Sequence, residues 1–163
     1  MQIKNAQSGH RGARAPPPMI CYADSSFLVA WFHPADQFAV AVTEWARIHV
    51  TEFIWNPILR AEVRHNLRRL KSQYSRTAWN AYRASEKTRR LILGRQSLTD
   101  LLSAGDDLST EKATEISAGT WDFVHVAAFL ESKAHYFATL DKLQGELAAA
   151  IVPKHRVKLF KDL

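Results

Sequence analysis

Two short apolar segments of this chain each end beside an aspartate, and a helix-like segment follows each aspartate. Asp24 comes directly after residues 20–23, and Asp141 comes two residues after residues 136–139. In an α/β fold, the carboxyl ends of parallel strands and the starts of the following helices converge on one edge of the sheet. This strand–aspartate–helix pattern therefore predicts an α/β domain with polar side chains gathered at that edge.

Strand-like and helix-like segments alternate along the chain, which predicts a three-layer α/β/α domain with a mostly parallel central sheet of four to five strands. Asp36 is the expected N-cap of the second helix. Asn56 and Pro57 are typical of the N-cap and the first position of the third. Strands are expected at 20–23, 51–55, 136–139 and 156–160, and helices at 25–32, 37–49, 57–70, 72–93, 110–117, 121–130 and 142–150, with a loop and a short helix at 97–108.

The 163 residues are enough for one domain with a sizeable core. Residues 1–18 are basic, contain three consecutive prolines and lack the apolar segment of a secretory signal, so we expect a flexible tail before a domain at 19–163. The longest clean apolar run, residues 27–32, is too short to span a bilayer, and no membrane association is expected. A single cysteine, Cys21, excludes an internal disulfide, is expected to be a buried thiol and fits a cytoplasmic protein.

Two further carboxylates, Glu62 and Asp122, lie in the first turns of helix-like segments. Four acids at one sheet edge would repel one another unless a cation held them, and carboxylate oxygens suit Mg²⁺ or Mn²⁺ better than zinc. Acidic residues also favour helix N-caps and first turns for local reasons. The spacing alone therefore leaves metal binding and helix capping both open. Asp122 is the harder one to explain as a cap, because it opens an otherwise almost wholly apolar helix.

The net charge of +6 is unevenly distributed along the chain. Residues 60–95 contain eleven Lys or Arg residues against two acidic ones. Such a block suits a surface that meets a polyanion or an acidic partner, although basic helix faces are also often simply solvated. Trp79 and Tyr82 lie among these arginines. We expect them to pack against the core with the arginines outward, and an RNA groove with stacking aromatics is the alternative.

On a helical wheel, Asn66 and Arg69 lie close to Glu62, and both are candidates for contacts with a substrate phosphate. A separate stripe on the same helix could bind nucleic acid, bind an acidic partner or face water. It consists of Arg60, Arg64 and Arg68. His125 follows Asp122 by one turn, and for it we expect a packing or hydrogen-bonding role rather than metal ligation.

Four short motifs occur in order along residues 19–163. They are Asp24–Leu28, Leu59–Val63, Trp121–Ala128 and Phe137–Asp141. Together they resemble the signature of PIN-domain nucleases, particularly the VapC-type toxins of bacterial toxin–antitoxin pairs. The basic segment at 72–95 is a departure, because the core motifs of the family do not constrain it.

The resemblance implies an endoribonuclease that depends on Mg²⁺ or Mn²⁺ and hydrolyses RNA phosphodiester bonds with a metal-activated water. It implies an RNA substrate, a cognate VapB-type antitoxin and frequent homodimers. The family's acidic catalytic positions are matched by Asp24, Glu62, Asp122 and Asp141. Of these, Asp24, Asp122 and Asp141 are the expected metal ligands, and Ser25 or Thr139 matches the small hydroxyl residues beside them.

Two alternatives stay open at this point. One is a PIN-fold module that binds RNA or protein without catalysis, and the other is a PIN nuclease outside a toxin–antitoxin system. A phosphatase that uses Asp24 as a covalent nucleophile is set aside. The haloacid-dehalogenase pattern requires a second aspartate two residues after the first, and this chain has Ser26 at that position.

Overall fold

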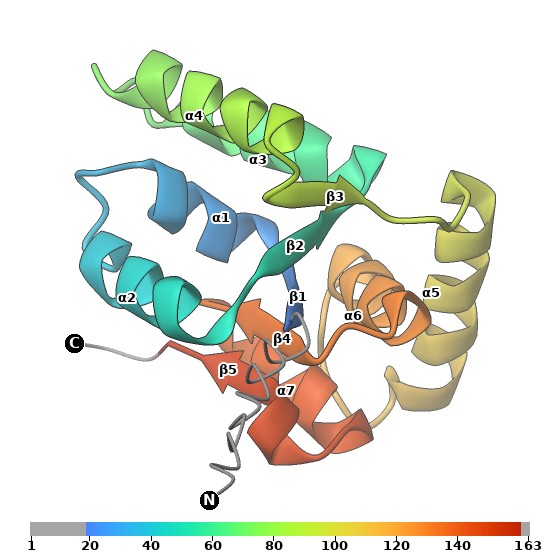
Figure 1. The fold of residues 1–163 in the computed structure, drawn as a ribbon. Coiled ribbons are helices and arrows are strands. Elements are labelled where there is room, and N and C mark those ends of the chain that lie inside the picture. Colours follow the sequence, from blue (N-terminus) through green and yellow to red (C-terminus); the bar gives the residue numbers. More distant parts are fainter. Residues whose placement is uncertain (1–18, 161–163) are drawn as a thin grey trace, which may run out of the picture.

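A computed structural model describes residues 19–160, so the predicted tail at 1–18 lies outside the described residues. Within the described range, five strands form one sheet in the order β3-β2-β1-β4-β5 (Figure 1). The four strand pairings are all parallel. The strands are β1 (Ile20–Ala23), β2 (Glu52–Trp55), β3 (Leu91–Leu93), β4 (Tyr136–Thr139) and β5 (Val157–Leu159). The predicted α/β fold with a parallel sheet is confirmed.

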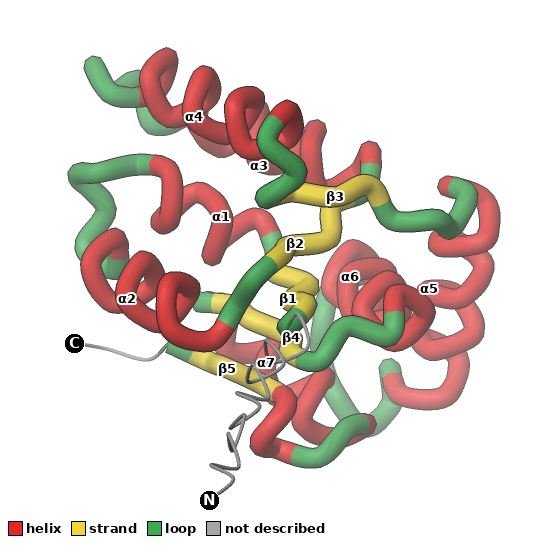
Figure 2. Tube along the Cα trace, viewed as in Figure 1, coloured by secondary structure: helices red, strands yellow, loops and turns green. Residues whose placement is uncertain are grey.

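Helices cover both faces of the sheet, which gives the three predicted layers (Figure 2). One face carries α1 (Ser25–Phe32), α2 (Ala39–His49), α3 (Pro57–Arg69) and α4 (Ser75–Lys87). The other carries α5 (Leu98–Lys112), α6 (Thr120–Ser132) and α7 (Lys142–Ile151), and a short 3₁₀ turn, Lys154–Arg156, precedes β5. This division follows from right-handed crossovers, because the chain adds strands on one side of β1 and then on the other. None of the described helices has the length and apolar character needed to cross a membrane.

The strand order reverses between β1 and β4, which makes the carboxyl ends of these two central strands a topological switch point. Ala23 pairs with Ala138, and the Asp24 N–H donates to the Ala138 carbonyl at 3.0 Å. The ends of both strands are therefore level. The residues that follow them, Asp24 on one strand and Thr139 to Asp141 on the other, lie side by side.

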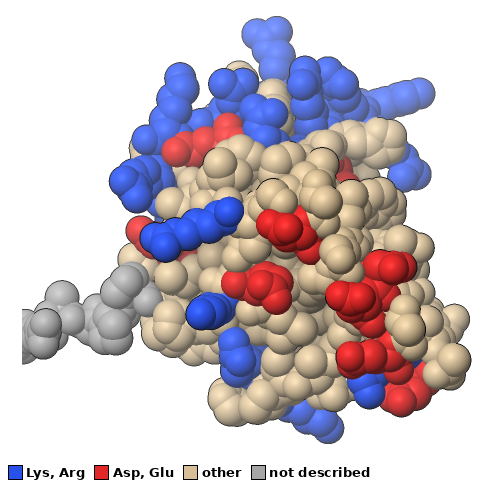
Figure 3. Space-filling view, turned by 90° about the vertical axis from the view of Figure 1, so that its right-hand side faces the viewer, with Lys and Arg blue, Asp and Glu red and all other residues tan. Residues whose placement is uncertain are grey.

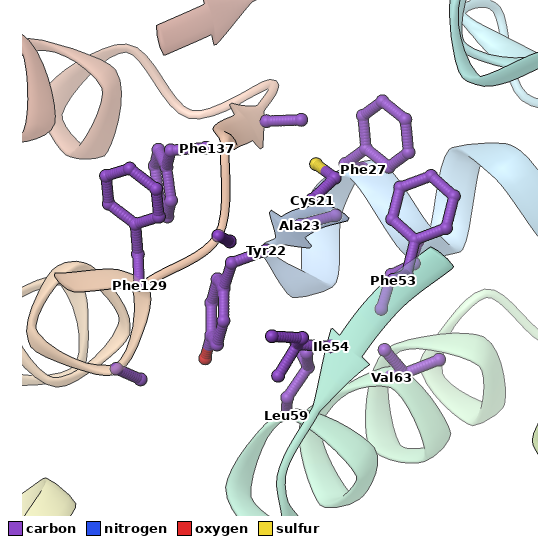
Figure 4. Close-up of a cluster of buried hydrophobic side chains, with 14 of the residues drawn as sticks. Cys21, Tyr22, Ala23, Phe27, Phe53, Ile54, Leu59, Val63, Phe129 and Phe137 are labelled. Carbon is purple, nitrogen blue, oxygen red and sulfur yellow. The ribbon is translucent and has the colours of Figure 1, made fainter. Parts of the chain in front are cut away.

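Large aromatic side chains fill the space between the sheet and its helices. Figure 4 shows Tyr22 between Phe129 and Phe137 on one side and β2 and α3 on the other. The rings of Tyr22 and Phe137 stack with centroids 6.1 Å apart. The rings of Tyr22, Phe129 and Phe137 are fully buried, and the burial of each contributes roughly 1.5–3 kcal/mol to the stability of the fold. Cys21 is buried as predicted, and burial raises the pKa of its thiol.

The predicted helix at 72–93 is wrong in its second part. Helix α4 ends at Lys87, and Arg89 has a positive φ of 60° in the turn that follows. Residues 91–93 form strand β3, which pairs with residues 53–55 of β2. The helical periodicity of the arginines concealed this strand, since parallel pairing with a distant segment outweighs local helix propensity.

The prediction between residues 97 and 117 is also wrong. A single helix, α5, spans residues 98–112 in place of a loop with a short helix and a second helix at 110–117. The sequence contains its start signal, because Ser97 and Asp100 form a reciprocal capping box. Helix α2 begins at Ala39, and Asp36 accepts the Phe38 N–H in the preceding turn without being its N-cap.

Candidate active site

Asp24 is a buried carboxylate at the centre of the sheet edge, where it is the N-cap of α1. It accepts hydrogen bonds from the Phe27 N–H at 2.9 Å, from the Ser26 hydroxyl at 2.8 Å and from the Thr139 hydroxyl at 2.9 Å. Burial raises the pKa of Asp24, and these hydrogen bonds together with His125 lower it in part. The carboxylate is therefore fixed in position while its ionised form lacks the hydration it has in water.

Thr139 connects two of the predicted acids. Its hydroxyl donates to Asp24 and accepts the Asp141 N–H at 2.9 Å. Asp141 is the N-cap of α7, where it accepts the Gln144 N–H at 3.0 Å, and its side chain is exposed. The ends of β1 and β4 are thus joined by side chains as well as by backbone pairing.

The Ser26 hydroxyl, rather than that of Ser25, contacts Asp24. It also accepts the Leu140 N–H at 3.0 Å, so it bridges α1 and the end of β4. The Ser25 hydroxyl makes no hydrogen bond within the described residues. The role predicted for Ser25 stays a prediction, whereas Thr139 lies where that prediction needs it.

Asp122, in the first turn of α6, is half-buried and accepts the Gly119 N–H at 2.7 Å. Its other oxygen accepts the side-chain amide of Gln144 at 3.0 Å. A chain of hydrogen bonds therefore runs from Asp24 through Thr139, Asp141 and Gln144 to Asp122. Three of the four predicted acids belong to this chain.

The fourth acid, Glu62 on α3, is held by a separate buried chain of polar groups. The Asn56 amide donates to the Tyr22 hydroxyl at 3.0 Å, and that hydroxyl lies 2.9 Å from His125 Nδ1. His125 Nε2 lies 2.6 Å from Glu62 Oε2. The Tyr22 hydroxyl thus hydrogen-bonds to both Asn56 and His125 Nδ1. An ionised carboxylate can only accept, so His125 Nε2 donates to Glu62.

This second chain was missed by sequence reasoning, apart from the hydrogen-bonding role expected for His125. The sequence nevertheless contains a signal for this second chain of polar groups. Tyr22 and His125 are the polar members of two otherwise apolar segments, and buried polar groups are almost always paired. Their separation by 103 positions hid the fact that each is the partner of the other.

Glu62 and Asn66 line the same cavity of about 530 Å³, which also contacts Pro57, Leu98 and the exposed indole of Trp121. Asn66 therefore lies near Glu62, as the helical wheel predicts. Arg69 is exposed near the end of α3 and makes no ion pair with the four acids in the described structure.

Among residues 19–160, no three His, Cys, Asp or Glu side chains are grouped so that they could hold a metal ion. The predicted ligands Asp24, Asp122 and Asp141 lie at the same edge of the sheet, where they accept hydrogen bonds from Thr139, Gln144 and backbone N–H groups. The structure thus links these residues through Thr139 and Gln144 without grouping their carboxylates as a three-ligand site.

The fold is similar to that of a solved toxin structure. Mycobacterium tuberculosis VapC20, described as a sarcin–ricin loop cleaving toxin, superposes with a TM-score of 0.64 over 82% of this chain and 97% of its own, at 13% identity. No family model matches the chain, and no curated protein sequence matches it at a significant level. At this identity the comparison shows a shared fold. The chain therefore has the fold of a VapC-type PIN domain, as the resemblance in the sequence predicts.

Proposed function

We propose that this chain is an endoribonuclease that depends on Mg²⁺ or Mn²⁺ and acts as the toxin of a toxin–antitoxin pair. The observation that carries the proposal is the chain of hydrogen bonds that links Asp24, Asp141 and Asp122 at the switch point of the sheet, in a fold shared with a sarcin–ricin loop cleaving toxin. Ligands of open α/β sheets bind at this place, outside the carboxyl ends of the strands. A cluster of carboxylates repels RNA unless a cation lies between them.

The residues present suit a hard divalent cation by their chemistry. All three predicted ligands offer carboxylate oxygens, and Asp141 keeps one oxygen without a hydrogen bond among the described residues. Mg²⁺ is usually held by one or two carboxylates and keeps several waters, so a three-ligand cage is not required. Bound there, the ion would lower the pKa of a water molecule and offset the charge of the phosphate.

The chain's own side chains have distinct roles in this proposal. Asp24 is a fixed ligand, because Ser26 and Thr139 hold both of its oxygens. Glu62, oriented by His125, faces a cavity and is placed to accept a proton from the attacking water. Asn66 in the same cavity is the closer candidate for a contact with the substrate phosphate, and Arg69 a more distant one.

The second candidate is a PIN-fold module that binds RNA or protein without catalysis. One observation favours it, namely that no three-ligand group is present among residues 19–160. A PIN nuclease outside a toxin–antitoxin system is a further variant of the leading proposal. A VapB-type antitoxin, a homodimer and a cytoplasmic location stay predictions.

The test is an RNA cleavage assay with the full-length chain in Mg²⁺, in Mn²⁺ and in EDTA. We expect wild-type protein to cleave a labelled hairpin RNA only with metal. The Asp24→Asn and Asp122→Asn variants should each lose about 10²-fold or more in kcat. The matched control is Asp106→Asn, an exposed aspartate on α5, which should cleave like wild type. Binding of RNA without turnover in either metal would favour the second candidate.

A further inference from the structure

A groove of about 710 Å³ lies on α3 beside the cavity that Glu62 lines. Its walls are Trp55, Arg60, Arg64, His65, Arg68 and Glu86. Pro57, Ala61 and His65 line both the groove and the cavity, so they form a ridge between the two. A polymer that reaches the acidic edge through the cavity can therefore cross this ridge into the groove.

Lys and Arg gather at the top of the view in Figure 3, over α3 and α4, and acidic residues lie lower down. The groove residues Arg60, Arg64 and Arg68 belong to α3. Not all of this charge is free to bind a ligand. Arg60 and Arg83 pair with Glu86 at 2.8 Å and 3.1 Å. Arg90 donates to backbone carbonyls at the end of α2, including that of Ala46 at 3.1 Å.

Arg64 and Arg68 differ from these, because neither pairs with a carboxylate in the part of the chain that the structure describes. They are exposed on successive turns of α3, about 6 Å apart along the helix axis. The Arg64 guanidinium lies 5.5 Å from the centroid of the Trp79 ring, over which Arg60 also lies at 5.1 Å. Stacking on this indole holds Arg64 in place, which reduces the entropy that it loses on binding.

We propose that this groove binds the phosphate backbone of a single-stranded RNA segment next to the cleaved bond, with Arg64 and Arg68 contacting successive phosphates. Guanidinium groups match phosphate oxygens in a two-pronged geometry, and their spacing suits an extended strand. This assignment rests on the proposed ribonuclease function. An acidic polypeptide is the competing occupant. RNA is favoured because the groove adjoins the cavity of Glu62 across a single ridge.

The test measures binding of a fluorescent 12-nucleotide single-stranded RNA to the full chain in EDTA, by anisotropy across a range of KCl concentrations. The Arg64→Ala/Arg68→Ala variant should bind roughly tenfold more weakly, and the slope of log K against log salt should shrink by about 1.4, or about 0.7 for each phosphate contact. The control Arg47→Ala/Lys154→Ala removes the same charge from exposed positions outside the groove and should change the slope much less.

Equal effects of the two double variants overturn the groove assignment. Polyglutamate that displaces the RNA from wild type, but binds more weakly to the groove variant, assigns the groove to an acidic polypeptide and also overturns it. Cleavage is then measured separately. If wild type cleaves and the groove variant binds RNA normally, only the groove assignment fails. If RNA binds through the groove but is never cut in Mg²⁺ or Mn²⁺, only the nuclease function fails.

Discussion

Asp24 and Glu62 are held by side chains from distant parts of the chain, whereas Asp122 and Asp141 are held mainly at the starts of their own helices. Thr139 reaches Asp24 from β4, and His125 reaches Glu62 from α6. Asp24 also accepts a backbone N–H of its own helix, but for Asp122 and Asp141 such a bond is the main one, and only Gln144 reaches Asp122 from another helix. We call these pairs the buried half and the capping half of the acidic edge.

This difference indicates which part of the site is built before a ligand arrives. Asp24 is buried, and the half-buried Glu62 is held by the buried His125, so tertiary contacts set the geometry of this half. The caps of the other half are single bonds near water, each of which contributes about 1 kcal/mol and can be exchanged for water or a ligand. We therefore infer that Asp122 and Asp141 reorient more readily than Asp24.

The largest expected effect comes from removing the Tyr22 hydroxyl from the buried half. The Tyr22→Phe variant leaves buried groups of His125 and Asn56 without their partner, so the free energy of unfolding should fall by about 1–3 kcal/mol. Tyr82→Phe is a matched control, because this equally buried hydroxyl has no hydrogen-bond partner in the described structure. It should be neutral or slightly stabilising. Urea denaturation measures both, and equal losses would contradict the role of the Tyr22 chain.

A smaller effect is expected from the two neighbouring serines. Ser26→Ala removes a hydroxyl that shares its one hydrogen between the two Asp24 oxygens and accepts the Leu140 N–H, and should cost about 1–1.5 kcal/mol. Ser25→Ala, one residue earlier in α1, should change stability by less than about 0.5 kcal/mol. Thermal unfolding of the two variants compares them directly. A greater loss from Ser25→Ala would instead support the role expected for that residue from the sequence.

The smallest expected change in stability comes from replacing an aspartate by asparagine in metal-free buffer. The change should have opposite signs in the two halves of the acidic edge. Burial raises the pKa of Asp24 above its value in the unfolded chain. The folded state is therefore favoured by the neutral carboxyl group below a pH of about 4, and this stability is lost as the pH rises through the pKa of the folded state. Asp24→Asn should therefore stabilise the protein at pH 7, with no gain near pH 3.

Asp122→Asn should instead destabilise the protein at pH 7 by about 0.3–1 kcal/mol, because it removes a negative charge from the start of α6. Denaturation curves at both pH values test the pair of variants. Destabilisation by Asp24→Asn at pH 7 would show that its hydrogen bonds outweigh the cost of burying its charge.

Much of the fold and part of the site follow from local sequence. The strands that precede Asp24 and Asp141 are short, apolar and bounded by capping residues. Their predicted type of secondary structure and their predicted bounds therefore agree with the structure. Strand β3 was mistaken for helix, because its three residues acquire their conformation by pairing with β2. Helix α5 stands where a loop with a short helix and a second helix at 110–117 were predicted, although the Ser97 capping box marks its start.

The sequence by itself determined which acids lie at the carboxyl edge of the sheet. Strand ends and helix starts are local features of the sequence, and parallel strands place their ends at the same edge. What only the tertiary structure decided is how each acid is held. Ser26 rather than Ser25 contacts Asp24, and Tyr22 directs His125 toward Glu62. The physical reason is that hydrogen bonds between side chains depend on ångström distances across the core, and spacing along the chain carries no information about them.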